Sequence, residues 1–176
     1  MRSRMMFFDG GGVTFTGGEC TLQSAELLPL LKRLTESGIS TCIETNGSLS
    51  CLKELAEYID YLIVDLKHPD DAEHRYWTGQ SNAQTLENIG YFLDSGRQIH
   101  IRIPLINGVN ICPEKFMEFF SRFDTANAVF EFLPYHEFGK DKWKGGYQMK
   151  DAFVSSETVA EFTRIFEIYG LKTVRT

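Results

Sequence analysis

The 176-residue sequence contains only four cysteines, and no two of them stand as close together as the cysteine pairs of zinc and iron–sulfur sites. Their spacing also provides no disulfide framework. Cys42 lies in an apolar, strand-like run, so it is interpreted as a small buried hydrophobic side chain, and the same interpretation is favoured for Cys20, Cys51 and Cys112. The cysteines of this chain therefore indicate no metal site.

Long apolar runs and a surplus of basic residues are also absent. No apolar run approaches the roughly 20 residues of a membrane span, and residues 1–4 lead into no apolar segment of the signal-peptide type. The net charge of -6 argues against a general nucleic-acid binder, which would have a basic face. We therefore expect a cytoplasmic protein that binds neither nucleic acid nor a membrane.

The residues that are present predict one globular α/β domain. Hydrophobic residues make up 43% of the chain, and short β-rich runs alternate with longer helical patterns. Strands are expected at 13–16, 40–47, 60–67, 98–106 and 128–136, with a short one near the C-terminus. Helices are expected at 25–36, 52–58, 83–93, 113–123 and 155–169. This alternation predicts a parallel sheet of five or six strands, which is a partial barrel or an open sheet because a closed barrel needs eight.

Polar residues follow the apolar run of each predicted strand. Because the carboxyl ends of parallel strands meet at one rim, we expect these side chains to lie close together. The set consists of Gly17, Gly18, Glu19, Glu44, Thr45, Asp65, Lys67, Arg102 and His136. Its carboxylates suit an ammonium group or a bound cation, its lysine and arginine suit a carboxylate, and its histidine suits a heterocycle. A zwitterionic amino acid joined to a nucleoside would match all of them.

Each residue of this rim also has an ordinary structural interpretation. Glu19 could cap the following helix, since a carboxylate is favoured at a helix N-terminus. Asp65 and Lys67 could form a surface pair, Arg102 could be a structural ion-pair partner, and His136 could be a core histidine. The joint placement at five strand ends is what favours a binding site.

The motifs at these positions resemble those of a known family. GGGVTFTGGE, ETNG, DLK, IRIPLI and LPYHEFGKDKW occur in this order, and together they resemble the glycyl-radical-enzyme activating enzymes of the radical S-adenosylmethionine (radical SAM) superfamily. The resemblance covers essentially the whole chain. It implies a partial (β/α)6 barrel of the TIM-like, radical SAM type that spans residues 1–176 as a single core domain and holds S-adenosylmethionine against a [4Fe–4S] cluster.

The resemblance also implies a role for each residue of the rim. Glu19, in the GGE motif with Gly17 and Gly18, would receive the methionine ammonium, with Glu44 beside it. His136 would contact the nucleoside. Lys67 and Arg102 would line the region where the methionyl group meets the glycine loop of the partner. A monovalent cation is implied next to the cofactor, at Glu44, Thr45, Asp65 and the backbone near Ile63.

The implied activity is the activation of a glycyl radical enzyme such as pyruvate formate-lyase. The reduced cluster would cleave S-adenosylmethionine, and the 5′-deoxyadenosyl radical would take a hydrogen from a glycine of the partner enzyme. This chemistry belongs to the cofactors, so no catalytic side chain is assigned. The implied electron donor is a reductant of the flavodoxin or ferredoxin type.

One motif of the family is absent from the sequence. The family binds its cluster through CxxxCxxC upstream of GGE, and this chain contains no such segment. We therefore expect an N-terminally truncated core without its first β/α unit, either as a shortened chain, a truncated reading frame or one part of a split protein. It would carry no cluster and be inactive alone. The strand at 13–16 would then be an exposed edge, paired with another chain or partly disordered.

Two alternatives remain open at this point. The chain could be a non-catalytic fragment or split-gene module that binds S-adenosylmethionine or the glycine loop of a partner. It could also be an unrelated α/β-barrel enzyme acting on an anionic metabolite, with Lys67 as a Schiff-base amine. The partner enzyme is not identified by the sequence: pyruvate formate-lyase is the default, and a glycerol lyase, a choline lyase or a decarboxylase remain alternatives.

Overall fold

The computed structural model describes residues 11–138 and 151–174, in which strands and helices alternate. The strands are β1 (Gly12–Phe15), β2 (Ser40–Thr45), β3 (Tyr61–Asp65), β4 (Ile99–Leu105), β5 (Ala128–Pro134) and β6 (Thr173–Val174). The helices are α1 (Ser24–Glu36), α2 (Leu52–Leu55), α3 (Asp71–Thr78), α4 (Ala83–Asp94), α5 (Pro113–Phe120) and α6 (Ser156–Ile168), with 3-10 turns at Cys20–Gln23 and Ala56–Tyr58.

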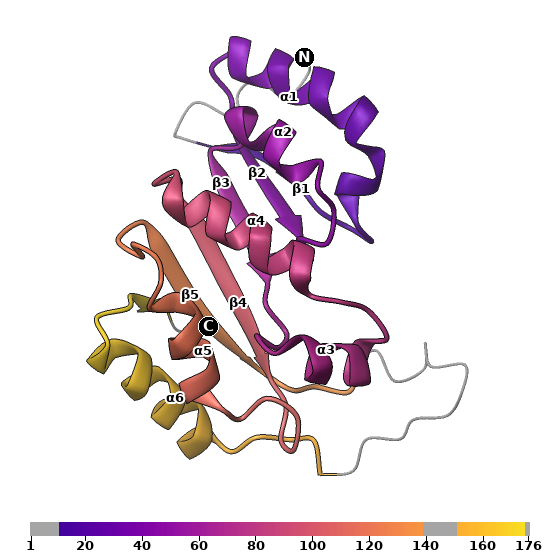
Figure 1. Cartoon of the computed structure of the whole chain (residues 1–176). Coiled ribbons are helices and arrows are strands. Elements are labelled where there is room, and N and C mark those ends of the chain that lie inside the picture. The colour runs from indigo at the N-terminus through magenta and orange to yellow at the C-terminus, as the bar shows by residue number, and fades with distance from the viewer. Residues whose placement is uncertain (1–10, 139–150, 175–176) are drawn as a thin grey trace.

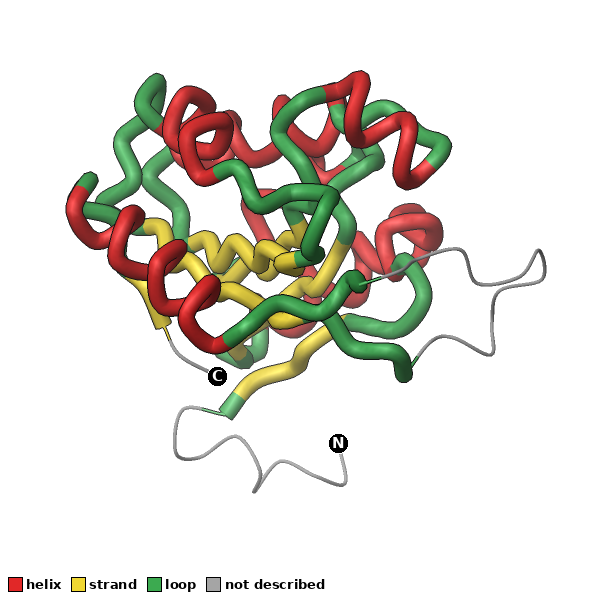
Figure 2. Tube along the Cα trace, turned by 90° about the horizontal axis from the view of Figure 1, so that it is seen from below, coloured by secondary structure: helices red, strands yellow, loops and turns green. Residues whose placement is uncertain are grey.

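The strands form one six-stranded sheet in the order β1-β2-β3-β4-β5-β6, and every neighbouring pair is parallel. Sequential order with right-handed crossovers places the connecting helices on the same face of the sheet. Figures 1 and 2 show this layer of helices on one side of the strands. The predicted α/β class and parallel sheet are confirmed, and the open sheet is consistent with a partial barrel.

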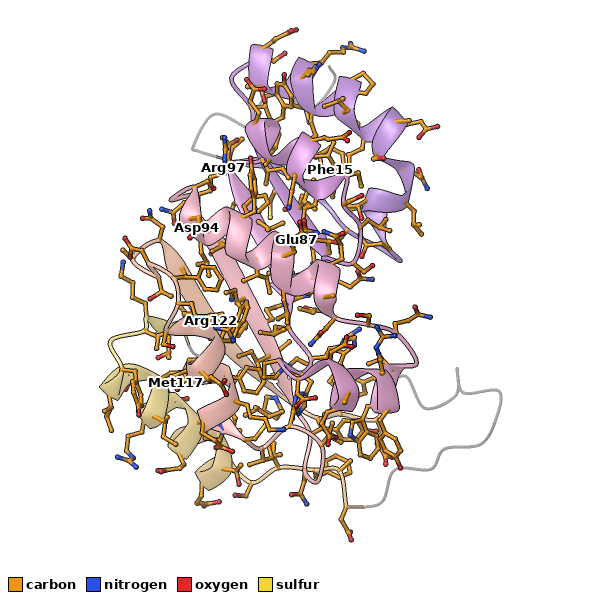
Figure 3. All side chains as sticks on the ribbon, viewed as in Figure 1. Phe15, Glu87, Asp94, Arg97, Met117 and Arg122 are labelled. Carbon is orange, nitrogen blue, oxygen red and sulfur yellow. The ribbon has the colours of Figure 1, made fainter. Side chains whose placement is uncertain are left out.

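The hydrophobic core lies between the sheet and this helix layer. Side chains alternate along the strands, so that the residues facing the helices are buried and their neighbours in sequence face the other way. The densest part is a cluster of phenylalanine rings from β5, α5 and α6, in which Phe166 contacts Phe130 and Phe132 edge to face. Met117 of α5, labelled in Figure 3, belongs to the same core. This core fixes β4 and β5 relative to each other.

Most predicted elements agree with the structure. Ser155 caps α6, the helix predicted at 155–169, by accepting a hydrogen bond from the backbone N–H of Thr158. Helix α5 ends at Phe120 instead of Phe123, and the terminal strand is short. Most of the predicted loop at 137–151 lies outside the described residues.

Helix α3 was not predicted. Its N-cap is Asp70, whose carboxylate accepts hydrogen bonds from the N–H groups of Ala72 and Glu73. Its C-cap is Gly79, which has a φ of 76°. Aspartate at the N-cap and glycine in the left-handed conformation after the last turn are the signals that would have revealed it. The helix lies at the carboxyl end of the sheet, apart from the layer formed by the other helices (Figure 1).

At the first edge of the described sheet, β1 pairs with β2 and has no second neighbour among the described residues. The predicted pairing of this edge with another chain, or its partial disorder, stays a prediction because residues 1–10 lie outside the described part. None of the helices in residues 11–138 and 151–174 is long and apolar enough to span a membrane.

Candidate cofactor site

Glu19 joins the ends of β1 and β2. Its Oε1 accepts hydrogen bonds from the hydroxyl groups of Thr21 and Thr45, both at 2.6 Å, and from the backbone N–H of Thr21 at 3.2 Å. Its Oε2 accepts one hydrogen bond, from the backbone N–H of Asn46 at 2.9 Å. Glu19 therefore does cap the 3-10 turn that follows it, and it also binds the loop after β2. Both the structural and the site interpretation agree with this geometry.

The environment of Glu19 keeps its carboxylate ionised. Burial by itself would raise the pKa of Glu19, but the hydrogen bonds from Thr21, Thr45 and Asn46 outweigh this effect and hold the pKa below its ordinary value. The turn that presents Glu19 depends on Gly17 and Gly18, whose φ angles are 90° and 56°. Side chains other than glycine are strained in this region of φ. The GGE motif thus fixes a negative charge at the rim.

Arg102 bridges two other carboxylates of the rim. Parallel pairing puts Asp65 of β3 directly beside Arg102 of β4. The guanidinium donates to Asp65 Oδ1 at 2.9 Å and to Glu44 Oε1 at 2.6 Å. Burial opposes its charge, but these two carboxylates outweigh burial and raise the pKa of Arg102. The structure thus brings Glu44, Asp65 and Arg102 together, as an ion-paired triad.

A small cavity lies beside this triad. It has a volume of about 160 Å³, and its lining includes Asp65 and Lys67 after β3 and Asn46 after β2. Lys67 is exposed, and within the described residues its ammonium group makes no hydrogen bond or ion pair. A positively charged, accessible group in a polar cavity suits the carboxylate of a ligand.

His136 lies on the segment after β5 and is exposed. Its Nδ1 accepts a hydrogen bond from the backbone N–H of Phe138 at 3.4 Å, and its ring lies 4.6 Å from the ring of Phe138. It is not a core histidine. Its ring contacts in the described residues are with Phe138 and not with Glu19, Arg102 or Lys67, so its predicted contact with a nucleoside stays a prediction.

The residues predicted to hold a monovalent cation point to different partners. The hydroxyl of Thr45 donates to Glu19 and accepts from the N–H of Gly47, whereas the carboxylates of Glu44 and Asp65 are both bound to Arg102. A guanidinium thus lies between the two carboxylates of the predicted cation site. The cation itself stays a prediction.

Sequence reasoning missed a second polar group on the same face of the sheet. His100 Nε2 lies 3.0 Å from Glu131 Oε2, although the N–H direction does not meet hydrogen-bond geometry, and the ring of Tyr61 contacts the His100 ring edge on. Burial lowers the pKa of His100, against the effect of Glu131. The two-residue periodicity of strands would have found this pair. His100 lies two residues before Arg102 and so on the same face of β4, and Glu131 is a charged residue in an otherwise apolar strand.

The cysteines do not fit an iron–sulfur cluster. No group of three or more histidine, cysteine, aspartate or glutamate side chains in the described residues is arranged to hold a metal ion, and all four cysteines lie in this part of the chain. Cys20 donates to the carbonyl groups of Phe15 and Glu44, and Cys51 donates to that of Thr21. Burial raises the pKa of the Cys112 thiol to about 11. Cys20 and Cys51 thus donate to local carbonyl groups and do not converge on a common site.

Two further hollows lie away from the triad. One of about 260 Å³ lies between the end of β1 and α1 and includes Gly17, Glu19 and Cys20 in its lining. The other, a groove of about 590 Å³, lies along α6 and β5 and contains none of the predicted site residues. The rim is therefore the candidate site because of the chemistry of its side chains and not because of the volume of its cavity.

Comparison with known proteins identifies the family to which this chain belongs. The chain matches the radical SAM superfamily over residues 4–120. It is 33% identical over 176 aligned residues to the pyruvate formate-lyase 1-activating enzyme of Escherichia coli K12, with 94% of this chain and 71% of the relative covered. It is 33% identical over 143 residues to the choline trimethylamine-lyase activating enzyme of Oleidesulfovibrio alaskensis, with 77% of this chain covered. The chain spans about half the length of that relative, 46%.

A solved structure supports the same assignment. The crystal structure of a domain of a pyruvate-formate lyase-activating enzyme from Bacteroides vulgatus superposes with a TM-score of 0.76 at 29% identity. The match covers 95% of this chain and 99% of that domain. The family resemblance of the strand-end motifs is thereby confirmed: the chain belongs to the radical SAM superfamily and, within it, to the family of the pyruvate formate-lyase activating enzymes.

Proposed function

We propose that this chain is the part of a glycyl-radical-enzyme activating enzyme that binds S-adenosylmethionine. The observation that carries the proposal is Glu19: a carboxylate held ionised at the carboxyl ends of parallel strands, in a chain of this family. The activating enzymes of pyruvate formate-lyase and of choline trimethylamine-lyase are both among its relatives. The family match removes the alternative of an unrelated barrel enzyme with a Lys67 Schiff base.

The residues of the rim fit the cofactor in three places. Glu19 Oε2 accepts a single hydrogen bond in the structure, so it retains capacity for a donor such as the methionine ammonium. Lys67 would bind the methionine carboxylate from the cavity that it shares with Asp65. His136 would stack on the adenine. Arg102 would hold Glu44 and Asp65 in place beneath the methionyl group.

The hydrogen-abstracting chemistry would come from S-adenosylmethionine, which on one-electron reduction supplies a 5′-deoxyadenosyl radical. The described residues bind and orient the cofactor, and they need no acid or base. They do not fit the [4Fe–4S] cluster, so we derive no step through it and expect this chain alone to be inactive. Reconstitution with iron and sulfide should give no stoichiometric cluster absorbance, and a stoichiometric spectrum would contradict this expectation.

The partners follow from the same proposal. A glycyl radical enzyme such as pyruvate formate-lyase would present its glycine to the rim, and a flavodoxin or ferredoxin would supply the electron. We place the protein in the cytoplasm. The alternative that the chain acts only as a binding module shares the same cofactor site, so the binding test below applies to both.

The proposal is tested by isothermal titration of the chain with S-adenosylmethionine. Glu19→Gln keeps the size of the side chain but removes its charge, and we expect it to weaken binding at least tenfold. Glu36→Gln, at the end of α1, removes an exposed charge away from the rim and should leave the affinity within twofold. Equal affinity for the wild type and Glu19→Gln would overturn the assignment of Glu19, and no binding by the wild type would overturn the proposed site.

A further inference from the structure

Helix α3 is fixed in place although none of its residues is buried. Asp71 anchors it by accepting hydrogen bonds from the hydroxyl of Ser81 and the N–H of Asn82, and it pairs with Arg75 at 2.6 Å. Lys115 of α5 pairs with Asp70 at its N-terminus. These polar contacts hold the helix at the carboxyl end of the sheet, where it contributes little to the core.

One face of α3 belongs to the candidate site. His74 and Thr78, which are one helical turn apart, line the cavity that also contains Asp65 and Lys67. The position of α3 therefore sets one wall of the rim. Any ligand or peptide that reaches Lys67 from this side passes along the helix.

The outer face of α3 carries two exposed aromatic side chains. Tyr76 is 77% exposed and Trp77 is 38% exposed, and their rings meet edge to face at 4.9 Å. Arg75, their neighbour, pairs with Asp71, and the exposed Glu73, one turn before Trp77, leaves a negative charge beside the two rings. Exposed tyrosine and tryptophan in a fixed position are the residues most enriched among the hot spots of protein interfaces.

We propose that Tyr76 and Trp77, here called the α3 platform, dock the glycine-bearing segment of the partner enzyme. This inference rests on the proposed function. A glycine in a protein backbone reaches the rim only if the surrounding polypeptide covers the rim, and Trp77 directly precedes the cavity-lining Thr78. The occupant is an extended peptide segment that places an apolar or aromatic side chain against the platform. The platform thus selects the partner, while Glu19 and Lys67 bind the cofactor.

A matched pair of double variants tests the platform. Tyr76→Ala/Trp77→Ala removes it, and Ile168→Ala/Tyr169→Ala removes exposed side chains of 65% and 68% exposure at the C-terminal end of α6. The second pair lies at the opposite end of the molecule from the rim, because α6 runs antiparallel to the strands. The probes are purified pyruvate formate-lyase and choline trimethylamine-lyase, each immobilised for a binding measurement with the chain alone, in which no cluster is needed.

We expect the wild-type chain and the Ile168→Ala/Tyr169→Ala control to bind one of these lyases with Kd values within twofold of each other. The platform variant should bind at least tenfold more weakly while its affinity for S-adenosylmethionine is unchanged. Equal lyase binding by the platform variant would overturn the platform and leave the proposed function standing. Failure of the wild type to bind either lyase would overturn the platform as a docking site for these two enzymes, while the affinity for S-adenosylmethionine tests the proposed function separately.

A second experiment follows the fluorescence emission of Trp77 and keeps both side chains of the platform. The chain has two tryptophans, so Trp143→Phe leaves Trp77 as the only one. Addition of the lyase should shift the Trp77 emission to shorter wavelength, since docking covers the indole. An unchanged Trp77 spectrum at a lyase concentration that saturates binding would also overturn the platform.

Discussion

On the helix-covered face of the sheet, Val64 and Ile101 are fully buried, whereas on the opposite face their neighbours Asp65 and Arg102 form an ion pair. The two faces use alternate residues of the same strands. One face supplies the apolar burial that stabilises the fold, and the other supplies the charged groups that we assign to the cofactor. Substitutions on the helix-covered face should therefore lower the free energy of unfolding more than substitutions on the opposite face.

The largest effect is expected in the core. Phe166→Ala removes a fully buried ring that contacts other rings from α5, β5 and α6, and it should lower the free energy of unfolding by about 3–5 kcal/mol. Phe153→Ala, at an exposed ring, should change it by less than about 0.5 kcal/mol. Urea unfolding measures both. A Phe166→Ala variant as stable as Phe153→Ala would contradict this account of the core.

Arg102→Ala should have the next largest effect on stability. It leaves Glu44 and Asp65 facing each other without their cation, and we expect a loss of about 1–3 kcal/mol, less than for a fully buried pair because the guanidinium is 20% exposed. Arg164→Ala removes a pair in which Arg164 is 60% exposed and should cost less than about 1 kcal/mol. If both variants lost the same stability, the triad would be no more than a surface ion pair.

Thr45→Val should act through Glu19. The variant loses a 2.6 Å hydrogen bond to the carboxylate and leaves the N–H of Gly47 without its acceptor, so it should cost about 1–2 kcal/mol at pH 7. The pKa of Glu19 is lowered in the folded chain, so the stabilisation is present above the ordinary carboxyl range and is lost as the pH falls through the lowered value.

The pH dependence distinguishes this effect from simple packing. The difference between wild type and Thr45→Val should shrink in acid, as Glu19 takes up a proton, and an NMR titration of the Glu19 carboxyl should show a higher pKa in the variant. A stability difference that is independent of pH, with the Glu19 pKa unchanged, would show that Thr45 acts only through its volume.

The smallest effect is expected at α3. Hydrogen bonds from Ser81 and Arg75 lower the pKa of Asp71 to about 2, so the contribution of Asp71 to folding is present above its ordinary value of 3.8 and is lost as the pH falls toward 2. In the Trp143→Phe background, the Trp77 emission should stay constant from pH 7 to pH 4 and change below. Asp71→Asn should show the changed emission already at pH 7 while the urea midpoint moves little. If the Trp77 emission changed identically in acid with and without Asp71→Asn, this would count against Asp71 as the anchor of α3.

The sequence predicted the sheet because period-2 alternation and strand–helix order are local signals. It also predicted that Asp65 and Arg102 lie together, since each follows an apolar run in one of two neighbouring parallel strands, although Arg102 lies within β4 and not at its end. It did not predict α3, because a helix without buried residues has no apolar periodicity to detect. The contacts of Glu19 with Thr45 and Asn46 could not be predicted either, because they depend on how the Gly17–Gly18 turn folds back onto the end of β2.

The central claim is that S-adenosylmethionine binds at the carboxyl-end rim. Hydrogen exchange with and without the cofactor tests it most directly, because the backbone N–H groups of Thr21 and Asn46 bind the Glu19 carboxylate. The account predicts slower exchange at residues 16–21 and 44–48 on addition of S-adenosylmethionine, with no change along α6. Protection along the α6 groove, or no protection at either rim segment at saturating cofactor, would contradict it.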